Sequence, residues 1–172
     1  ELKCAQKVQL FNMEPFFSSR PWTKILSDKK VLVVHPFTDT IEKQYKNREK
    51  LFGNKDILPK FELKTFKAVQ SLGGSSDFKD WFDALKYMED EIDKIDYDVA
   101  ILACGAYGFN LAAYIKRQGK QAVHLGGVTQ ILFGIKGKRW EYPVQKMCRN
   151  GYYPDLFNEY WIKPASSERP KS

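Results

Sequence analysis

Residues 98–108, DVAILACGAYG, carry the pattern that decides the fold of this chain. A short apolar run ends in a Gly-x-x-Gly turn, and a helical pattern follows. A second apolar run at 121–127, QAVHLGG, then ends in paired glycines. This order is typical of a strand, a turn, a helix and a second strand, with glycine where the chain leaves each strand. Because open α/β sheets bind ligands at the carboxyl ends of their strands, the pattern predicts a protein that binds a phosphorylated ligand.

Strands and helices alternate along the rest of the chain. Residues 30–35, KVLVVH, form an apolar run typical of a strand buried on both faces, and residues 62–69 alternate polar and apolar side chains. Between them, Asp39 and Glu42 have the spacing of a helix-capping box. A later apolar stripe has helical spacing: Phe78, Trp81, Phe82, Leu85, Met88, Ile92 and Ile95. We expect an α/β, Rossmann-like open sheet, mainly parallel, of about four or more strands in the order 2-1-3-4, with helices on both faces.

Length and composition favour a single domain. The 172 residues suffice for one continuous core. We expect it to span residues 1–163, with 1–28 as a lead-in segment and 164–172, PASSERPKS, as a flexible tail. The absence of a long apolar run or a signal peptide predicts a cytoplasmic protein, at most peripheral to a membrane. The chain begins with Glu1 rather than Met, which is typical of a processed chain or of a domain excised from a longer one, with a possible missing upstream segment.

The positive charge is concentrated in one part of the chain. Residues 116–149 hold eight basic residues and one acid, which accounts for the whole net charge of +7. Such a segment indicates an anionic ligand or partner, or a solvated basic face. The three cysteines form no CxxC pair, and Cys104 at the end of an apolar run is typical of a small buried hydrophobic residue.

The glycine turn at 105–108 is the first candidate binding site. Gly105, Ala106, Tyr107 and Gly108 open a helix, whose first N–H groups and dipole favour a phosphate or carboxylate. The alternative is a purely structural tight turn. Tyr107 could stack on a base or sugar, or cover the edge of the sheet.

Both histidines of the chain stand at expected carboxyl ends of strands. His35 and His124 are therefore candidate catalytic residues that could orient a diphosphate or act as acid or base near neutral pH. The alternative is that each is a hydrogen-bonded structural residue. Gly126, Gly127 and Gln130 follow His124 and are candidate donor-binding residues.

A basic loop at 134–140, GIKGKRW, is the third candidate. Lys136 and Arg139 could neutralise a diphosphate leaving group, which is the electrostatic need of glycosyl transfer. Single-stranded nucleic acid binders also combine cations with aromatic residues, but one short loop makes nucleic acid a poor candidate partner.

Several stretches resemble a known family: residues 35–52, 62–71, 80–127, 129–140 and 158–164. They are similar to a family of uncharacterised bacterial-type proteins linked to polysaccharide or capsule biosynthesis. That family is similar in turn to glycosyltransferases of the GT-D type, which are single Rossmann-like domains. The resemblance implies transfer of a sugar from a nucleoside diphosphate sugar to a glycan or glycosylated acceptor.

GT-D enzymes also carry an Asp-x-Glu motif for a divalent metal near the amino terminus. The first 60 residues contain no such motif, since Asp39 and Glu42 are one residue too far apart. The resemblance thus leaves a need for Mg or Mn open. Three functions follow: a nucleotide-sugar glycosyltransferase, a non-catalytic nucleotide- or sugar-binding domain, and an anionic-polymer binder using the basic segment.

Overall fold

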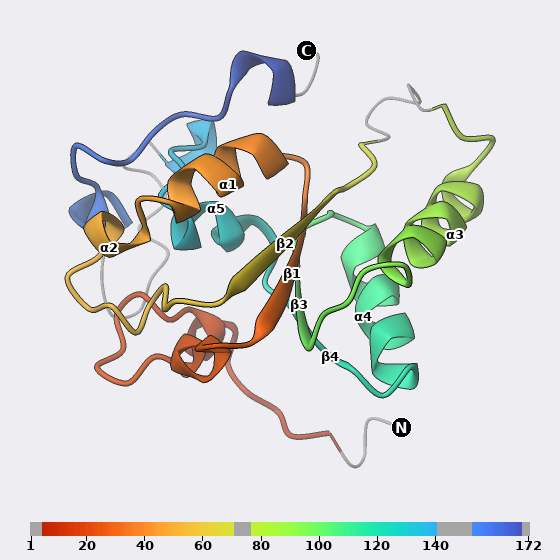
Figure 1. The fold of residues 1–172 in the computed structure, drawn as a ribbon, viewed down its shortest axis with the longest axis horizontal. Helices are drawn as coiled ribbons and strands as arrows, with labels where there is room; N and C mark the ends of the chain where they lie inside the picture. Colours follow the sequence, from red (N-terminus) through yellow and green to blue (C-terminus); the bar gives the residue numbers. More distant parts are fainter. Residues whose placement is uncertain (1–4, 71–76, 141–152, 170–172) are drawn as a thin grey trace.

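The computed structural model describes residues 5–70, 77–140 and 153–169, and its centre is a parallel β-sheet. The strands are β1 (Lys30–His35), β2 (Glu62–Lys67), β3 (Val99–Leu102) and β4 (Gln121–His124). They lie in the order β2-β1-β3-β4, and every pair is parallel (Figure 1). The expected α/β fold and its strand order are therefore confirmed.

Helices cover both faces of the sheet. They are α1 (Thr38–Tyr45), α2 (Arg48–Leu51), α3 (Trp81–Ile92), α4 (Tyr107–Arg117) and α5 (Thr129–Leu132). In Figure 1, α1, α2 and α5 lie on one side of the strands, and α3 and α4 lie on the other. Short 3-10 turns occupy Leu10–Met13, Trp22–Leu26, Gly126–Val128, Lys138–Trp140, Tyr153–Leu156 and Ser166–Glu168.

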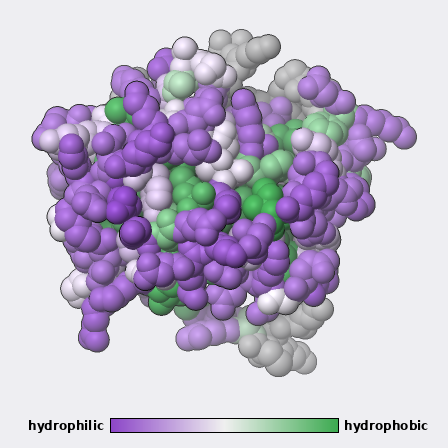
Figure 2. Space-filling view, in the orientation of Figure 1, coloured by the Kyte–Doolittle hydropathy of each residue, from purple (hydrophilic) through white to green (hydrophobic). Residues whose placement is uncertain are grey.

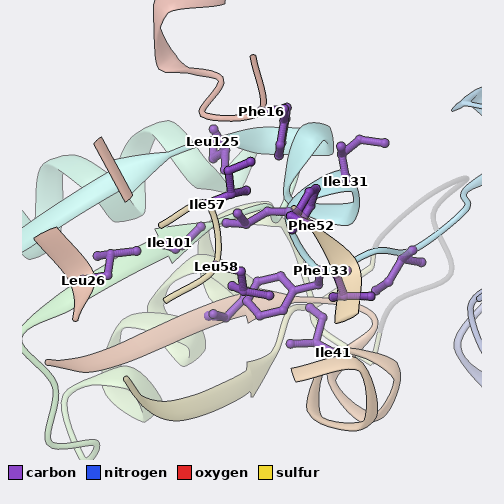
Figure 3. Close-up of a cluster of buried hydrophobic side chains, with 14 of the residues drawn as sticks. Phe16, Leu26, Ile41, Phe52, Ile57, Leu58, Ile101, Leu125, Ile131 and Phe133 are labelled. Atoms are coloured by element: carbon purple, nitrogen blue, oxygen red, sulfur yellow. The ribbon is translucent and has the colours of Figure 1, made fainter. Parts of the chain in front are cut away.

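Two apolar cores sandwich the sheet because successive side chains of a strand point to opposite faces. Val31 and Val33 of β1 pack with Ile41 of α1 and Ile131 of α5, in the cluster of Figure 3. Leu32 and Val34 instead join the core formed by α3 and α4, which includes Met88, Ile92, Leu111 and Ile115. The continuous apolar sequence of β1 is thus the sequence of a strand with no solvent face.

The edge strand β2 is only partly covered. Its four central residues are half-buried, and its two terminal residues, Glu62 and Lys67, are exposed. Figure 2 shows the face that β2 crosses: hydrophobic residues gather near its centre, and hydrophilic residues surround them. Charged side chains along an edge strand discourage pairing with another chain.

Three local expectations differ from the structure. Helix α1 begins after Phe37, and no side chain of its N-cap residue caps it, so Asp39 lies in the first turn and the capping box is wrong. Phe82 lies on the solvent side of α3 at 73% exposure, because it immediately follows the inward-facing Trp81. Residues 164–169, expected to be flexible, include a 3-10 turn and a buried Glu168.

The lead-in segment is attached to the domain. Leu26 is fully buried in the α1 side of the core, and the buried hydroxyl of Thr23 donates to the carbonyl of Asp56 at 2.9 Å. Phe16 stacks on Phe52 with ring centroids 6.2 Å apart. These contacts join residues 16–26 to the loop before β2.

Candidate functional site at the carboxyl edge of the sheet

The two central strands, β1 and β3, lie side by side and feed helices on opposite faces. Val34 pairs with Leu102, and the N–H of Ala103 donates to the carbonyl of Val34 at 2.9 Å. The chain then passes from β1 into α1 on one face and from β3 into α4 on the other. Such a switch point is where open α/β sheets form their ligand crevice.

The turn after β3 presents backbone rather than side chains to solvent. Cys104 is buried, whereas Gly105 and Ala106 are exposed. Gly105 has φ +58°, a left-handed conformation that favours glycine, and nothing lies within 4 Å of where its β-carbon would be. This turn therefore leaves open space at the amino end of α4.

The first N–H groups of this turn remain available to a ligand. The N–H groups of Tyr107 and Gly108 donate to the carbonyls of Cys104 and Gly105 at 3.3 and 3.1 Å. Within the described residues, the N–H groups of Gly105 and Ala106 donate no hydrogen bond. Exposed N–H groups at the positive end of a helix dipole favour an anion.

Tyr107 is a packing residue of this turn. Its side chain is buried, and its ring stacks on Trp81 of α3 with centroids 5.2 Å apart and planes 6° apart. Of the two roles considered for Tyr107, covering the sheet fits this position, and stacking on a ligand's base does not. The stack joins the amino ends of α3 and α4.

His124 ends β4 beside the first turn of α4. A β-carbon on Gly108 would lie 2.3 Å from Nε2 of His124, so the imidazole rests directly against the glycine backbone. Partial desolvation of the ring there lowers the pKa of His124 from its ordinary 6.5. The residue is otherwise exposed, and it is neutral and able to accept a proton at neutral pH.

His35 occupies the opposite face and the interior. The register aligns Val34, Leu102 and His124, so these three point to the α4 face, and His35, the residue after Val34, points to the α1 face. Its ring is 1% exposed, lies 4.8 Å from the ring of Phe37, and accepts the N–H of Phe37 on Nδ1 at 2.8 Å. Both histidines end strands as expected, but the structure does not bring them together, and the fold gives His35 a structural position.

The remaining donor-binding candidates lie beyond β4 and separate from one another. Gly126, with φ +66°, and Gly127 form the turn directly after β4, near His124. The side chain of Gln130 forms a hydrogen bond within the protein: its Oε1 accepts the indole N–H of Trp140 at 3.1 Å. Only the two glycines of this group stand at the carboxyl edge of the sheet.

The basic segment divides between two regions. Lys116, Arg117 and Lys120 lie at the end of α4 and before β4, which is the amino edge of the sheet. Lys136 lies elsewhere, with Nζ 5.4 Å from the ring centroid of Phe157, in a loop whose Ile135 bridges to Ile162. The side chain of Arg139 is outside the described residues, as are Cys4 and Cys148. The described cations therefore do not form one binding groove.

Sequence reasoning missed Glu168, which lies at the amino end of α1. Its carboxylate is buried and accepts the N–H groups of Asp39 and Thr40 at 2.8 and 3.2 Å. The signal was weak, because a single acid in a polar stretch gives no hint of burial. The sequence also contains two acids separated by one residue, Asp96 and Asp98, but they lie at the amino edge of the sheet. There, Asp98 accepts the backbone N–H of Lys30, and Asp96 accepts a hydrogen bond from its side-chain ammonium.

Metal ligands do not cluster in the described part of the chain. No group of three His, Cys, Asp or Glu side chains there could hold a metal ion. Three consecutive acids of α3, Glu89, Asp90 and Glu91, are partly paired, since Asp90 forms an ion pair with Lys86 and Glu91 forms one with Lys94. Among the same residues, no helix combines the length and apolar character needed to span a bilayer.

Comparison with known proteins adds no relative to this description. Neither a family model, nor a curated protein, nor a solved structure matches the chain.

Proposed function

We propose that this chain binds a nucleoside diphosphate sugar at the carboxyl edge of its sheet and is the donor-binding domain of a glycosyltransferase. The observation that carries the proposal is the open amino end of α4 at the switch point between β1 and β3. There, Gly105 and Ala106 are exposed, their N–H groups donate no hydrogen bond within the described residues, and nothing lies within 4 Å of a β-carbon built on Gly105. The step from a nucleotide to sugar transfer rests on the resemblance to GT-D enzymes.

The chemistry assigned to each group follows from its position. The N–H groups of Gly105 and Ala106 would bind a phosphate oxygen, which stabilises charge on the departing diphosphate. His124, neutral at physiological pH, would accept the proton of the attacking acceptor hydroxyl. Gly126 and Gly127 would allow the donor to approach the turn after β4 closely, since neither carries a side chain.

The divalent metal that the resemblance implies does not fit the described residues. No group of three or more His, Cys, Asp or Glu side chains there could hold a metal ion. Asp96 and Asp98, which are separated by one residue as in an Asp-x-Asp pattern, lie at the opposite edge of the sheet, and both accept hydrogen bonds from Lys30. We therefore assign no step of the reaction to a metal held by these residues.

The test is calorimetric titration of the protein with uridine and guanosine diphosphates and their sugars, followed by mapping of backbone amide shifts. Binding should shift the amides of Gly105, Ala106 and Gly126, and leave those of Gln118 and Gly119 unchanged. When a glycan acceptor is then added together with the donor, transfer of the sugar to the acceptor should release free nucleoside diphosphate. Lack of binding across the panel would overturn the proposal.

A non-catalytic nucleotide- or sugar-binding domain is the second candidate. The observation that favours it is the separation of the two histidines on opposite faces, which leaves His124 without a second imidazole nearby. This candidate predicts nucleotide binding with the same amide shifts but neither sugar transfer nor donor hydrolysis.

A further inference from the structure

The edge strand β2 carries a row of backbone groups that point away from the sheet. The N–H of Glu62 donates to the carbonyl of Lys29 at 2.8 Å, so the backbone of residue 62 faces the side of β1. Because successive residues of a strand turn their backbone groups to alternate sides, those of Leu63, Thr65 and Lys67 face outward. Within the described part of the chain, these three N–H groups donate no hydrogen bond outside the sheet.

The surface around this row is apolar at its centre and polar at its rim. Leu63 packs against the core on the α1 side and Phe66 against the core on the α3 side, yet both are only half-buried. The ring of Phe66 lies 6.3 Å from that of Tyr87 in α3, which is 42% exposed. Figure 2 shows hydrophobic residues near the centre of this face and hydrophilic residues around them. Such a patch is typical of a surface that contacts another protein.

The geometry of β2 restricts how a second copy of the chain could pair with it. A regular strand pair with two-fold symmetry is antiparallel, and residues directly opposite each other then lie on the same face of the joined sheet. One register meets this condition and pairs every outward residue. In it, Thr65 faces Thr65 of the second copy, and Leu63 faces Lys67 of the second copy. Each of these pairs exchanges both of its N–H···O bonds.

The charges near β2 are complementary in this register. Lys67 lies diagonally across from Thr65 of the second copy, within reach of a long side chain. The hydroxyl of Thr65 donates to the carboxylate of Glu42 at 2.5 Å, so the exposed Lys67 meets the exposed Glu42 of the second copy. On the other face, Lys64 is already paired with Glu62 of its own strand at 2.7 Å. The charges that discourage pairing with an unrelated strand are therefore matched in this arrangement.

We propose that β2 is a homodimer interface, in which the β2 strands of two copies of this chain pair antiparallel about a two-fold axis at Thr65. The two four-stranded sheets then form one continuous sheet. Because the pairing is antiparallel, the carboxyl edges of the two sheets point in opposite directions, so the two candidate sites lie at opposite ends of the dimer. The pairing does not depend on the identity of the ligand bound there.

Sedimentation equilibrium of the full chain measures this association, and the wild-type protein should form a dimer that dissociates on dilution. Thr65→Pro removes the outward N–H at the two-fold axis but no hydrogen bond to β1, so it should raise the dissociation constant at least about tenfold. Thr65→Val is the matched control, because it also loses the hydroxyl that bonds Glu42 but keeps the N–H, and it should remain a dimer. A monomeric wild-type protein, or an equally tight dimer in Thr65→Pro, would overturn the proposal.

Charge reversal tests the same interface without altering the backbone. Lys67→Glu should weaken the dimer, because it places two carboxylates against each other at both ends of the strand pair. Adding Glu42→Lys should restore the association, since the ion pair then forms with its charges exchanged. Higher salt should weaken the wild-type dimer. A second change that fails to restore the dimer would contradict the register.

Disulfide cross-linking identifies the residues that lie opposite each other, in protein with Cys4 and Cys148 replaced by serine. Thr65→Cys should form a disulfide-linked dimer, because α-carbons of a hydrogen-bonded pair lie about 5.5 Å apart, within the range of a disulfide. Leu63→Cys should not cross-link by itself, but a mixture of Leu63→Cys and Lys67→Cys should. Cross-linking of Leu63→Cys alone, with none in Thr65→Cys, would overturn this pairing.

Discussion

Gly108 and His124 are in direct contact across the gap between α4 and β4, and the contact requires glycine. A β-carbon at position 108 would lie 2.3 Å from Nε2 and 2.6 Å from Cδ2 of the imidazole. The ring is therefore held beside the first turn of α4, one turn of backbone away from Gly105. This relationship gives His124 both its position at the candidate site and its lowered pKa.

Gly108→Ala should displace the imidazole of His124 into solvent. The pKa of His124 should then rise toward 6.5, because the desolvation that lowers it is relieved. Stability should change little, since alanine favours the helix by about 1 kcal/mol and the exposed ring can move aside. An NMR titration of the imidazole measures the pKa. Gly53→Ala, whose added methyl meets open space, is the control, and an unchanged pKa in Gly108→Ala would contradict the contact.

The lowered pKa of His124 also predicts how stability depends on pH. As the pH falls through 6.5, the unfolded chain binds a proton at this residue while the native protein does not. The free energy of unfolding should therefore drop over this range, and less so in His124→Gln. Urea unfolding of both proteins between neutral and mildly acidic pH measures the difference. Parallel curves would show that the folded pKa is not lowered.

Gln44 should contribute strongly to stability through one buried amide. Its Nε2 donates to the carbonyls of Gly134 and Tyr160 at 2.8 and 3.1 Å, and so joins α1 to two later segments. Gln44→Ala should cost about 3 kcal/mol, because it leaves a cavity and unpaired carbonyls. Lys43→Ala, on the exposed side of the same helix, should cost little. Denaturant titration decides, and equal costs would contradict the role of Gln44.

Cys104 should be chemically inert in the native protein. Burial raises the pKa of its thiol to about 12, so almost no thiolate exists at neutral pH. In protein with Cys4 and Cys148 replaced by serine, Ellman's reagent at pH 8 should label Cys104 only after unfolding. Rapid labelling of the folded protein would show that this end of β3 is open to solvent.

The sheet could be predicted from the sequence because its strands depend on local patterns. The apolar run of β1 and the glycine turn after β3 report burial and chain reversal directly, and right-handed crossovers then restrict the strand order. Gly105 and Gly119 adopt left-handed backbone conformations that favour glycine, so the glycines themselves mark these turns in the sequence. These features need no information about distant contacts.

The site was less predictable because it depends on register and on distant segments. A shift of one residue between Val34 and His35 decides which face a side chain joins, and sequence patterns locate strand ends only approximately. That shift separates His35 from His124. The burial of Glu168 depends on contacts with Asp39 and Thr40, which no local pattern reports.

The most direct test of the nucleotide site compares Gly105→Ala with Gly119→Ala. Both glycines have positive φ, +58° and +79°, and neither has an atom within 4 Å of its added β-carbon, so each variant should lose about 1 kcal/mol of stability. They lie at opposite edges of the sheet. Gly105→Ala should weaken binding of the tightest nucleoside diphosphate about tenfold, since its methyl shields the phosphate-binding N–H groups. Gly119→Ala should leave the affinity unchanged. Equal affinities in the two variants would contradict a nucleotide site at the end of β3.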